Sequence, residues 1–126
     1  MSQDFSGRVV LVTGGSRGIG RAISVALGRA GAKVAINYVK DDAAAHSTLT
    51  DVEDAGGSGG VYQADVASEP AVQEMAINVE RTLGPIDMLV TSAGIAKAQN
   101  HRDLTFKQYK NIMATNVDGT FAPIMA

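Results

Sequence analysis

Apolar positions along the chain alternate between two periodicities, one typical of buried strands and one typical of helices. Residues 8–12 contain a continuous apolar run, which is typical of a strand buried on both faces of a parallel sheet. Over residues 19–30 the apolar positions recur at helical spacing, and Gly31 follows as a C-terminal cap. A second apolar run at residues 33–38 predicts the next strand.

The same alternation continues beyond the second predicted strand. Asp41 or Asp42 can cap a helix whose weak apolar face extends over residues 45–52. The glycine cluster at residues 56–60 predicts a flexible surface loop, and a short strand is expected around residues 61–64.

A third helix is predicted at residues 68–83, where a Gly-Pro pair at residues 84–85 ends it, because proline cannot continue a helix. Residues 87–91 predict a fourth buried strand. A capping box at residues 105–108 opens a fourth helix, and the chain reaches Ala126 a few residues into what is expected to be another.

This order of strands and helices, with short connections, predicts the fold class. Right-handed crossovers between parallel strands give one α/β sheet with helices on both faces, the doubly wound arrangement called the Rossmann fold. No linker or repeat interrupts residues 1–126, so we expect a single domain. The pattern stops after the fourth strand and the start of the following helices, which predicts a truncated version of that fold.

Composition narrows the class of function. The formal net charge is −2 and no basic stripe is present, so nucleic acid is not an expected partner. Cysteine is absent, and His46 and His101 are isolated, so no metal site is expected. With neither a signal peptide nor a long apolar run, no membrane association is expected and the predicted location is cytoplasmic.

The turn between the first strand and the first helix carries candidate chemistry. Residues 13–20 read Thr-Gly-Gly-Ser-Arg-Gly-Ile-Gly. Glycines let backbone N–H groups approach a pyrophosphate closely, and the helix N-terminus adds free N–H donors. A nucleoside triphosphate site fits poorly, because Arg21 and Ala22 stand where a P-loop requires Lys and Ser or Thr. A turn used only for packing is the alternative.

Four motifs in the right order give the chain a wider resemblance. They are the turn at residues 13–20, Asp65-Val66 after the third strand, Ala93-Gly94 after the fourth, and Asn116 within Thr-Asn-Val-Asp-Gly-Thr-Phe at residues 115–121. The chain resembles the N-terminal half of the classical short-chain dehydrogenase/reductase family. Residues 7–10 and 36–38 look most similar to its 3-oxoacyl-carrier-protein reductases.

The resemblance implies functions for particular residues. Asp65 and Val66 would contact the adenine, and Ala93 and Gly94 would pass close to the nicotinamide ribose. Asn116 would be the fourth member of a catalytic tetrad and would position a water. The pyrophosphate and adenosine ribose would be held by the residues of the turn: Gly14, Ser16, Arg17, Gly18, Ile19 and Gly20. Asp65 as a simple turn residue and Asn116 as a helix-breaking residue are the alternatives.

The end of the second predicted strand bears on the choice between NADP(H) and NAD(H). NAD specificity usually requires a carboxylate there to accept from the ribose 2′-OH. The chain instead has Asn37, and no carboxylate precedes Asp41. Asn37 could donate to a 2′-phosphate, and Arg17 could form a charge-assisted bond with it. We therefore expect NADP(H), with NAD(H) and a merely solvated Arg17 as the alternative.

Two departures from the family pattern concern stability and catalysis. Thr91-Ser92-Ala93-Gly94 replaces the usual Asn-Asn-Ala-Gly, so the bracing of the sheet is in question. The family's catalytic Ser and Tyr-x-x-x-Lys lie beyond the Asn116 motif. Tyr38, Tyr62 and Tyr109 do not substitute for that tyrosine, because none is followed four residues later by lysine.

The sequence therefore predicts the cofactor-binding half of an NADP(H)-dependent oxidoreductase. The whole enzyme would transfer hydride between nicotinamide and a small-molecule carbonyl, alcohol or acyl substrate, and these residues alone would be inactive. One alternative is a short non-catalytic protein that binds a dinucleotide or self-associates through its exposed strand edge, which leaves a homo-oligomer open. A nucleoside-binding methyltransferase is a second alternative, disfavoured by the glycine spacing and Asn116.

Overall fold

The computed structural model describes residues 5–92. The capping box at residues 105–108 and the helices predicted after it lie outside this range. Four strands and three helices alternate within the described part of the chain. Their order is β1 (Val9–Thr13), α1 (Gly18–Arg29), β2 (Lys33–Tyr38), α2 (Asp42–Asp54), β3 (Ser58–Gln63), α3 (Glu69–Leu83) and β4 (Met88–Thr91).

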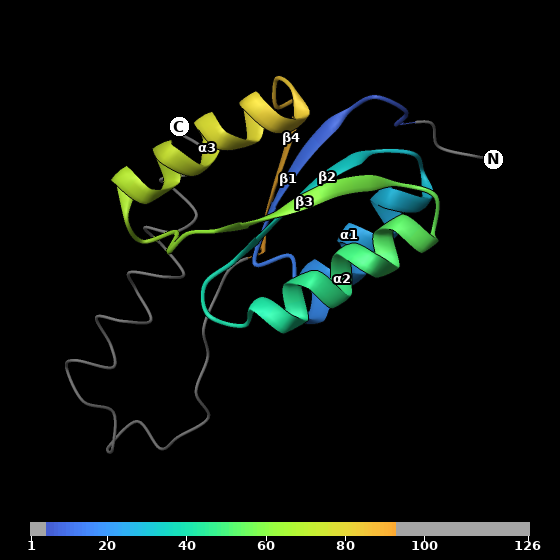
Figure 1. Ribbon diagram of the computed structural model, residues 1–126, viewed down its shortest axis with the longest axis horizontal. Coiled ribbons are helices and arrows are strands. Elements are labelled where there is room, and N and C mark those ends of the chain that lie inside the picture. The colour runs from blue at the N-terminus through green and yellow to red at the C-terminus, as the bar shows by residue number, and fades with distance from the viewer. Residues whose placement is uncertain (1–4, 93–126) are drawn as a thin grey trace, which may run out of the picture.

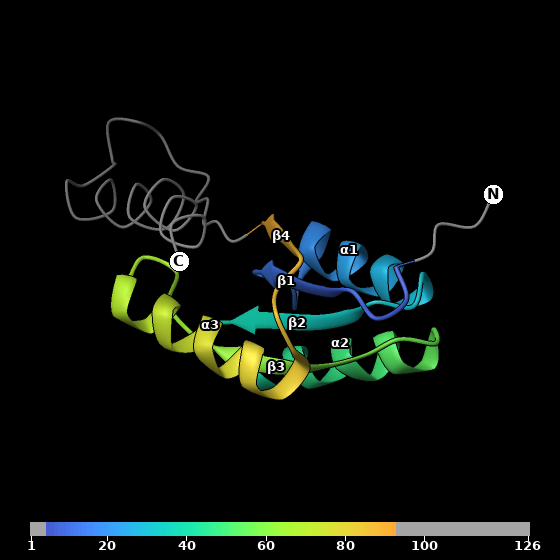
Figure 2. The ribbon, with the colours of Figure 1, turned by 90° about the horizontal axis from the view of Figure 1, so that it is seen from above.

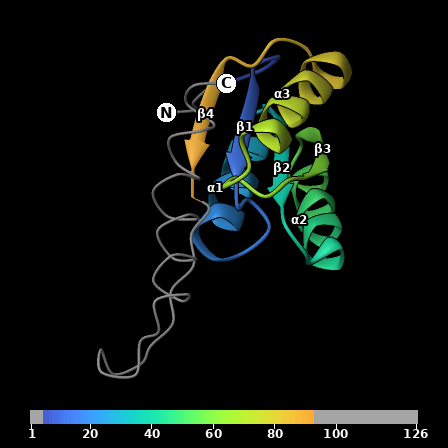
Figure 3. The ribbon, with the colours of Figure 1, turned by 90° about the vertical axis from the view of Figure 1, so that its left-hand side faces the viewer.

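The strands form one parallel sheet in the order β3-β2-β1-β4. Val10 of β1 pairs with Val34 of β2 on one side and with Met88 of β4 on the other. Figure 3 shows β1 and β4 side by side with their arrowheads pointing the same way. Successive strands first extend the sheet outward from β1, and β4 then joins on the opposite side of β1. The predicted doubly wound topology is confirmed, with its switch point between β1 and β4.

Helices cover both faces of the sheet, and the sequence of β1 explains why. Figure 1 shows the sheet between α3 on one side and α1 and α2 on the other, and Figure 2 shows β1 and β2 between α1 and α3. Val10 and Val12 belong to the apolar core beneath α1 and α2, whereas Val9 and Leu11 belong to the core beneath α3. Every residue of β1 is buried, as its continuous apolar run predicts.

The helix ends follow the predicted capping chemistry. Asp41 caps α2 by accepting from the Ala44 N–H at 2.9 Å, and Ser68 caps α3 by accepting from the Ala71 N–H at 3.4 Å. Gly84 stands at the end of α3 with a positive φ of 111°, a conformation that favours glycine. These caps fix where each helix enters and leaves the edge of the sheet.

The prediction of a flexible loop at residues 56–60 was wrong for its second half. β3 begins at Ser58, so Gly59 and Gly60 are strand residues that pair with Val34 and Ala35. A Cβ on Gly59 would lie 1.9 Å from the carbonyl oxygen of Val34. Gly59 therefore permits a close approach of the β2 and β3 backbones, rather than flexibility.

Within residues 5–92, no helix combines the length and apolar character needed to cross a membrane.

Candidate functional site

The glycine turn lies at the carboxyl end of β1, next to the carboxyl end of β4. In doubly wound sheets this switch point forms a crevice where ligands bind. Gly14 and Gly18 have φ values of 63° and 52°, which lie in the left-handed region that favours glycine. The glycines at these two positions allow the chain to leave β1 and enter α1 within a short turn.

Close packing inside the turn explains Gly20. A Cβ at this position would lie 2.2 Å from the carbonyl oxygen of Gly14 and 2.5 Å from the hydroxyl oxygen of Ser92. Neither the backbone of the turn nor the end of β4 leaves room for a side chain there. The first turn of α1 is thereby seated directly on the end of the sheet.

The start of α1 can hold an anion. Arg17 is the N-cap residue in an extended conformation, its side chain makes no capping bond, and the first turn contains no acidic residue. The first N–H groups of a helix have no partner within the helix, and its dipole favours negative charge at this end. Gly18, Ile19 and Gly20 supply this first turn, and Ile19 is 77% exposed. The turn therefore fits a pyrophosphate group.

Asn37 supports the turn from β2 and is not available to a ligand. It is fully buried, its Oδ1 accepts from the Gly14 N–H at 3.1 Å, and its backbone oxygen accepts from the Gly15 N–H at 3.0 Å. Its Nδ2 donates to the carbonyl oxygens of Tyr62 at 3.2 Å and Ala64 at 3.1 Å. The expectation that Asn37 donates to a 2′-phosphate is corrected, because internal acceptors already take its amide hydrogens.

Two buried hydroxyl groups that the sequence analysis missed also hold the turn. Ser24 Oγ on α1 donates to the carbonyl oxygen of Gly20 at 2.8 Å and lies 3.2 Å from that of Gly15. Thr48 Oγ1 on α2 lies 3.2 Å from the carbonyl oxygen of Ser16 and 2.9 Å from that of Ala44, so its single hydrogen is shared between these two acceptors. The sequence signal that could have identified Ser24 and Thr48 is their position as small polar residues on otherwise apolar helix faces. Their bonds orient the backbone of the turn before any ligand binds.

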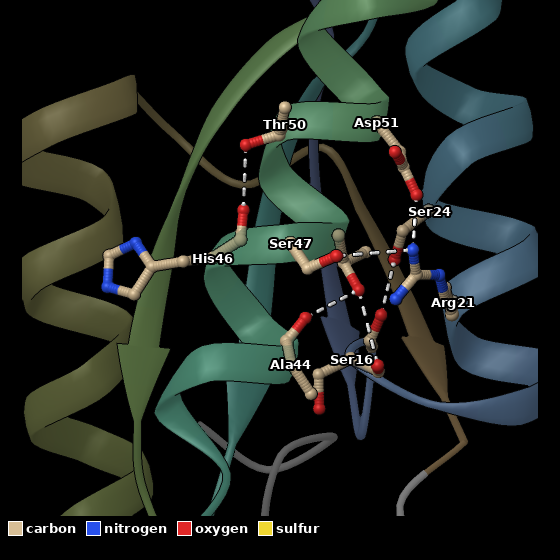
Figure 4. Close-up of polar contacts among 10 residues, drawn as sticks. Ser16, Arg21, Ser24, Ala44, His46, Ser47, Thr50 and Asp51 are labelled. Atoms are coloured by element: carbon tan, nitrogen blue, oxygen red, sulfur yellow. Dashed lines mark hydrogen bonds and ion pairs between the residues drawn. The ribbon is translucent and has the colours of Figure 1, made fainter.

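Arg21 ties α1 to α2 beside these bonds. Figure 4 shows its guanidinium reaching from α1 toward Ser47 and Asp51 on α2. Arg21 forms an ion pair with Asp51 and a hydrogen bond of 3.4 Å with the Ser47 hydroxyl. The residue that excludes a P-loop therefore has a structural function here.

Arg17 projects from the turn toward the loop after β2. Its Nη2 lies 2.6 Å from Oδ2 of Asp41, and 72% of the Arg17 side chain is exposed against 37% for Asp41. The backbone N–H of Ala44 and, to a lesser extent, the Arg17 guanidinium hold the pKa of Asp41 below its ordinary value. Arg17 is thus an exposed cation beside the glycine turn, where it can meet a ligand.

Ser92 joins the ends of β1 and β4. Its N–H donates to the Thr13 hydroxyl at 3.1 Å, and its own hydroxyl donates to the carbonyl oxygen of Thr13. The Thr13 hydroxyl in turn donates to the carbonyl oxygen of Val90 at 3.4 Å. The serine that replaces the family's usual asparagine therefore braces this edge of the sheet.

Asp65 is exposed at the surface, whereas the neighbouring Val66 is buried. Asp65 is exposed, and its Oδ1 accepts from the Ala67 N–H at 2.9 Å, so it is a turn residue whatever else it contacts. Val66 is fully buried in the core beneath α3. A contact between Val66 and adenine would therefore involve its backbone. Ala93, Gly94 and Asn116 lie outside the described residues.

Neither a metal site nor a proton-exchanging role for Tyr38 is found within residues 5–92. Within residues 5–92, no group of three His, Asp or Glu side chains is arranged to hold a metal ion. Tyr38 donates to Asp42 Oδ1 at 2.6 Å, and this bond raises the pKa of the tyrosine above its ordinary value. A tyrosine that exchanges a proton during hydride transfer requires the opposite shift.

A doubly wound parallel sheet with a glycine turn at its switch point defines an α/β domain of the Rossmann type. Within that class, the family model for the short chain dehydrogenases matches residues 8–126. The chain therefore belongs to the short-chain dehydrogenase family, whose members are oxidoreductases that use a nicotinamide dinucleotide.

Known relatives support this assignment over nearly the whole chain. It is 46% identical to acetoacetyl-CoA reductase of Shinella zoogloeoides over 114 residues, covering 90% of this chain and 45% of that protein. It is 32% identical to 3beta-hydroxysteroid dehydrogenase 1 of Eggerthella lenta, covering 97% of this chain and 47% of that protein. A dehydrogenase/reductase structure from Sinorhizobium meliloti 1021 superposes with a TM-score of 0.92 at 35% identity, covering 98% of this chain and 49% of that one. The chain spans just under half the length of these relatives.

Proposed function

We propose that this chain binds NADP(H) and forms the cofactor half of an oxidoreductase that interconverts a carbonyl and an alcohol. The observation that carries the proposal is the glycine turn at the β1–β4 switch point, where the first turn of α1 is free of acidic residues and Arg17 is exposed beside it. Such a site combines backbone donors for a pyrophosphate with a cation for an additional phosphate.

Each part of the cofactor has a proposed partner. The backbone of Ser16 and residues 18–20 holds the pyrophosphate, and Arg17 pairs with the 2′-phosphate. Gly14 contributes by letting the turn approach the cofactor closely, since its N–H is already bonded to Asn37. Asp65 accepts from the adenine amino group, while the backbones of Val66 and of residues 93–94 follow the adenine and the nicotinamide ribose. When bound, the nicotinamide supplies or accepts the hydride, and the protein provides binding and orientation.

The catalytic part of the proposal depends on Asn116. We propose that it positions a water in a proton relay, as its resemblance to the family tetrad implies. The Ser and the Tyr-x-x-x-Lys of that tetrad have no counterpart in residues 1–126. A protein of these residues alone is therefore expected to bind cofactor without turnover, and turnover by it would contradict this assignment.

The protein is further proposed to be cytoplasmic.

A binding titration tests the cofactor assignment on the protein as its full reading frame encodes it. NADPH and NADH are titrated calorimetrically against wild type, Arg17→Ala and the control Arg29→Ala, an exposed arginine in the last turn of α1. Loss of a charge-assisted bond is expected to weaken NADPH binding about 10- to 100-fold and to change NADH binding little. Equal losses for both cofactors would contradict the NADP(H) preference, and no binding of either would contradict the dinucleotide site.

For the substrate we propose a 3-oxoacyl thioester. The similarity to acetoacetyl-CoA reductase supports this class over other carbonyl compounds. Acetoacetyl-CoA and an unrelated ketone are compared as oxidants of NADPH by its loss of absorbance. Faster turnover of the unrelated ketone would overturn the thioester assignment while leaving the cofactor assignment intact.

One observation favours a second candidate, a non-catalytic protein that self-associates. β4 is an edge strand of the described sheet, paired only with β1, and its residues Met88, Leu89 and Val90 are only half-buried. An apolar edge strand can pair with another chain. Concentration-dependent dimerisation together with absent turnover by the full reading-frame product would favour this candidate.

A further inference from the structure

The Asp41 carboxylate makes two contacts at once in this structure. One carboxylate oxygen caps α2 by accepting from the Ala44 N–H, and the other lies 2.6 Å from the Arg17 guanidinium. Arg17 and Asp41 are separated by 24 positions in the sequence, so the fold brings the glycine turn and the loop after β2 together here. The ion pair links these two segments at the carboxyl end of the sheet.

The position of this pair bears on cofactor choice. In doubly wound dinucleotide sites, the adenosine ribose lies near the carboxyl end of the second strand, where a carboxylate reads a 2′-OH and a cation reads a 2′-phosphate. The structure puts both kinds of group at this end of the sheet and pairs them with each other. Asn37, at the end of β2, is turned inward and takes no part.

We infer that Asp41 is a specificity-determining residue that limits the preference for NADP(H) by competing with the cofactor's 2′-phosphate for Arg17. This inference rests on the proposed function. A bound 2′-phosphate must share Arg17 with the carboxylate or displace it, and the carboxylate also repels the phosphate. A 2′-hydroxyl neither competes for Arg17 nor is repelled by the carboxylate. Asp41 therefore narrows the difference in affinity between NADP(H) and NAD(H).

Asp41→Asn tests this without removing the helix cap. Asparagine is as good an N-cap residue as aspartate, so its side-chain oxygen can still accept from the Ala44 N–H. The matched control is Asp42→Asn, which removes the neighbouring charge. That carboxylate bonds to Tyr38 and His46 and not to Arg17. A general change in net charge would affect the two variants alike.

The measurement is calorimetric binding of 2′,5′-ADP and 5′-ADP to the full reading-frame product and both variants. Asp41→Asn is expected to tighten binding of 2′,5′-ADP about two- to fivefold, the range that an exposed ion pair allows, and to leave 5′-ADP unchanged. Asp42→Asn is expected to change either affinity by less. In the Arg17→Ala background, Asp41→Asn should give a smaller gain, because only the repulsion between carboxylate and phosphate is then removed.

The outcomes separate this inference from the proposed function. A wild-type preference for 2′,5′-ADP that Asp41→Asn leaves unchanged or weakens would overturn the inference alone. An equal gain in both single variants would also overturn it, because net charge would then be the cause. Absence of binding to either nucleotide by the wild type would overturn the proposed function and this inference together.

Discussion

The hydroxyl group of Thr48 lies 3.2 Å from the carbonyl oxygen of Ser16 and joins the middle of α2 to the glycine turn. Asn37 holds the same turn from β2, and Ser24 holds it from α1. All three side chains are buried. The turn is therefore fixed from three elements, and its N–H groups are oriented before a ligand arrives, which lowers the entropic cost of binding.

Thr48→Val should both destabilise the fold and weaken cofactor binding. The substitution keeps the shape of the side chain but removes the hydroxyl that the Ser16 and Ala44 carbonyls share, and an unsatisfied buried acceptor costs about 1–3 kcal/mol. Thr50→Val is the control, since that hydroxyl bonds only along α2 to the His46 carbonyl and is exposed (Figure 4). Urea unfolding and a cofactor titration measure both effects. Equal losses in the two variants would show that the turn does not depend on Thr48.

Gly20→Ala should disrupt the packing of the first turn of α1 against the end of the sheet. The new Cβ would lie 2.2 Å from the Gly14 carbonyl oxygen, so the turn must move. Overpacking of this kind costs about 1–3 kcal/mol. Ala22→Ser, at an exposed position on the same helix, serves as the control. Thermal unfolding tests the prediction, and a Gly20→Ala variant as stable and as tightly cofactor-binding as the control would contradict it.

The fold was predictable because its signals are local. The run at β1 and the helical spacing of α1 and α3 place each element within a few residues of its observed bounds. The start of β3 was not predictable in this way. Gly59 carries no side chain to show a strand periodicity, and its function depends on the Val34 carbonyl, which is distant in sequence.

The site was predictable only in part, for a related reason. The glycines of the turn could be predicted as functional because the positive φ angles and close packing of this turn require glycine. The direction of a polar side chain is set by tertiary packing, so Asn37 could be expected at the end of β2 but not turned inward toward Ala64. Thr48 and Ser24 have no sequence motif at all. The pairing of Arg17 with Asp41 required the fold itself.

Asn37→Asp should destabilise the protein rather than convert it to NAD(H) specificity. The Asn37 amide donates to the carbonyls of Tyr62 and Ala64, and a carboxylate there would face two acceptors in a buried site. A buried charge without a partner costs about 3–5 kcal/mol. Gln63→Glu is the control, because its amide donates to the Val39 carbonyl on the surface. Urea unfolding at neutral pH measures both. A stable Asn37→Asp variant with raised NADH affinity would contradict the structural function assigned here.

The charge of Asp41 should contribute to stability with a defined pH dependence. The Ala44 N–H and then Arg17 hold its pKa below the ordinary value of about 4. A carboxyl group whose pKa is lower in the folded than in the unfolded state stabilises the fold above the unfolded pKa and loses that contribution as the pH falls through the folded pKa. Asp41→Asn should therefore be less stable than wild type at pH 7, with the difference shrinking in acid.

Urea unfolding of wild type and Asp41→Asn at neutral pH and at several acid values below the ordinary aspartate pKa measures this difference. Added salt should reduce the part due to Arg17, because the pair is exposed. A difference independent of pH would show that the charge of Asp41 does not contribute. The same substitution is expected to tighten binding of a 2′-phosphate while it lowers stability. Because the two effects have opposite signs, a gain in affinity cannot arise from a more stable fold. It must come from the freed Arg17 and from the loss of the carboxylate that repels the phosphate.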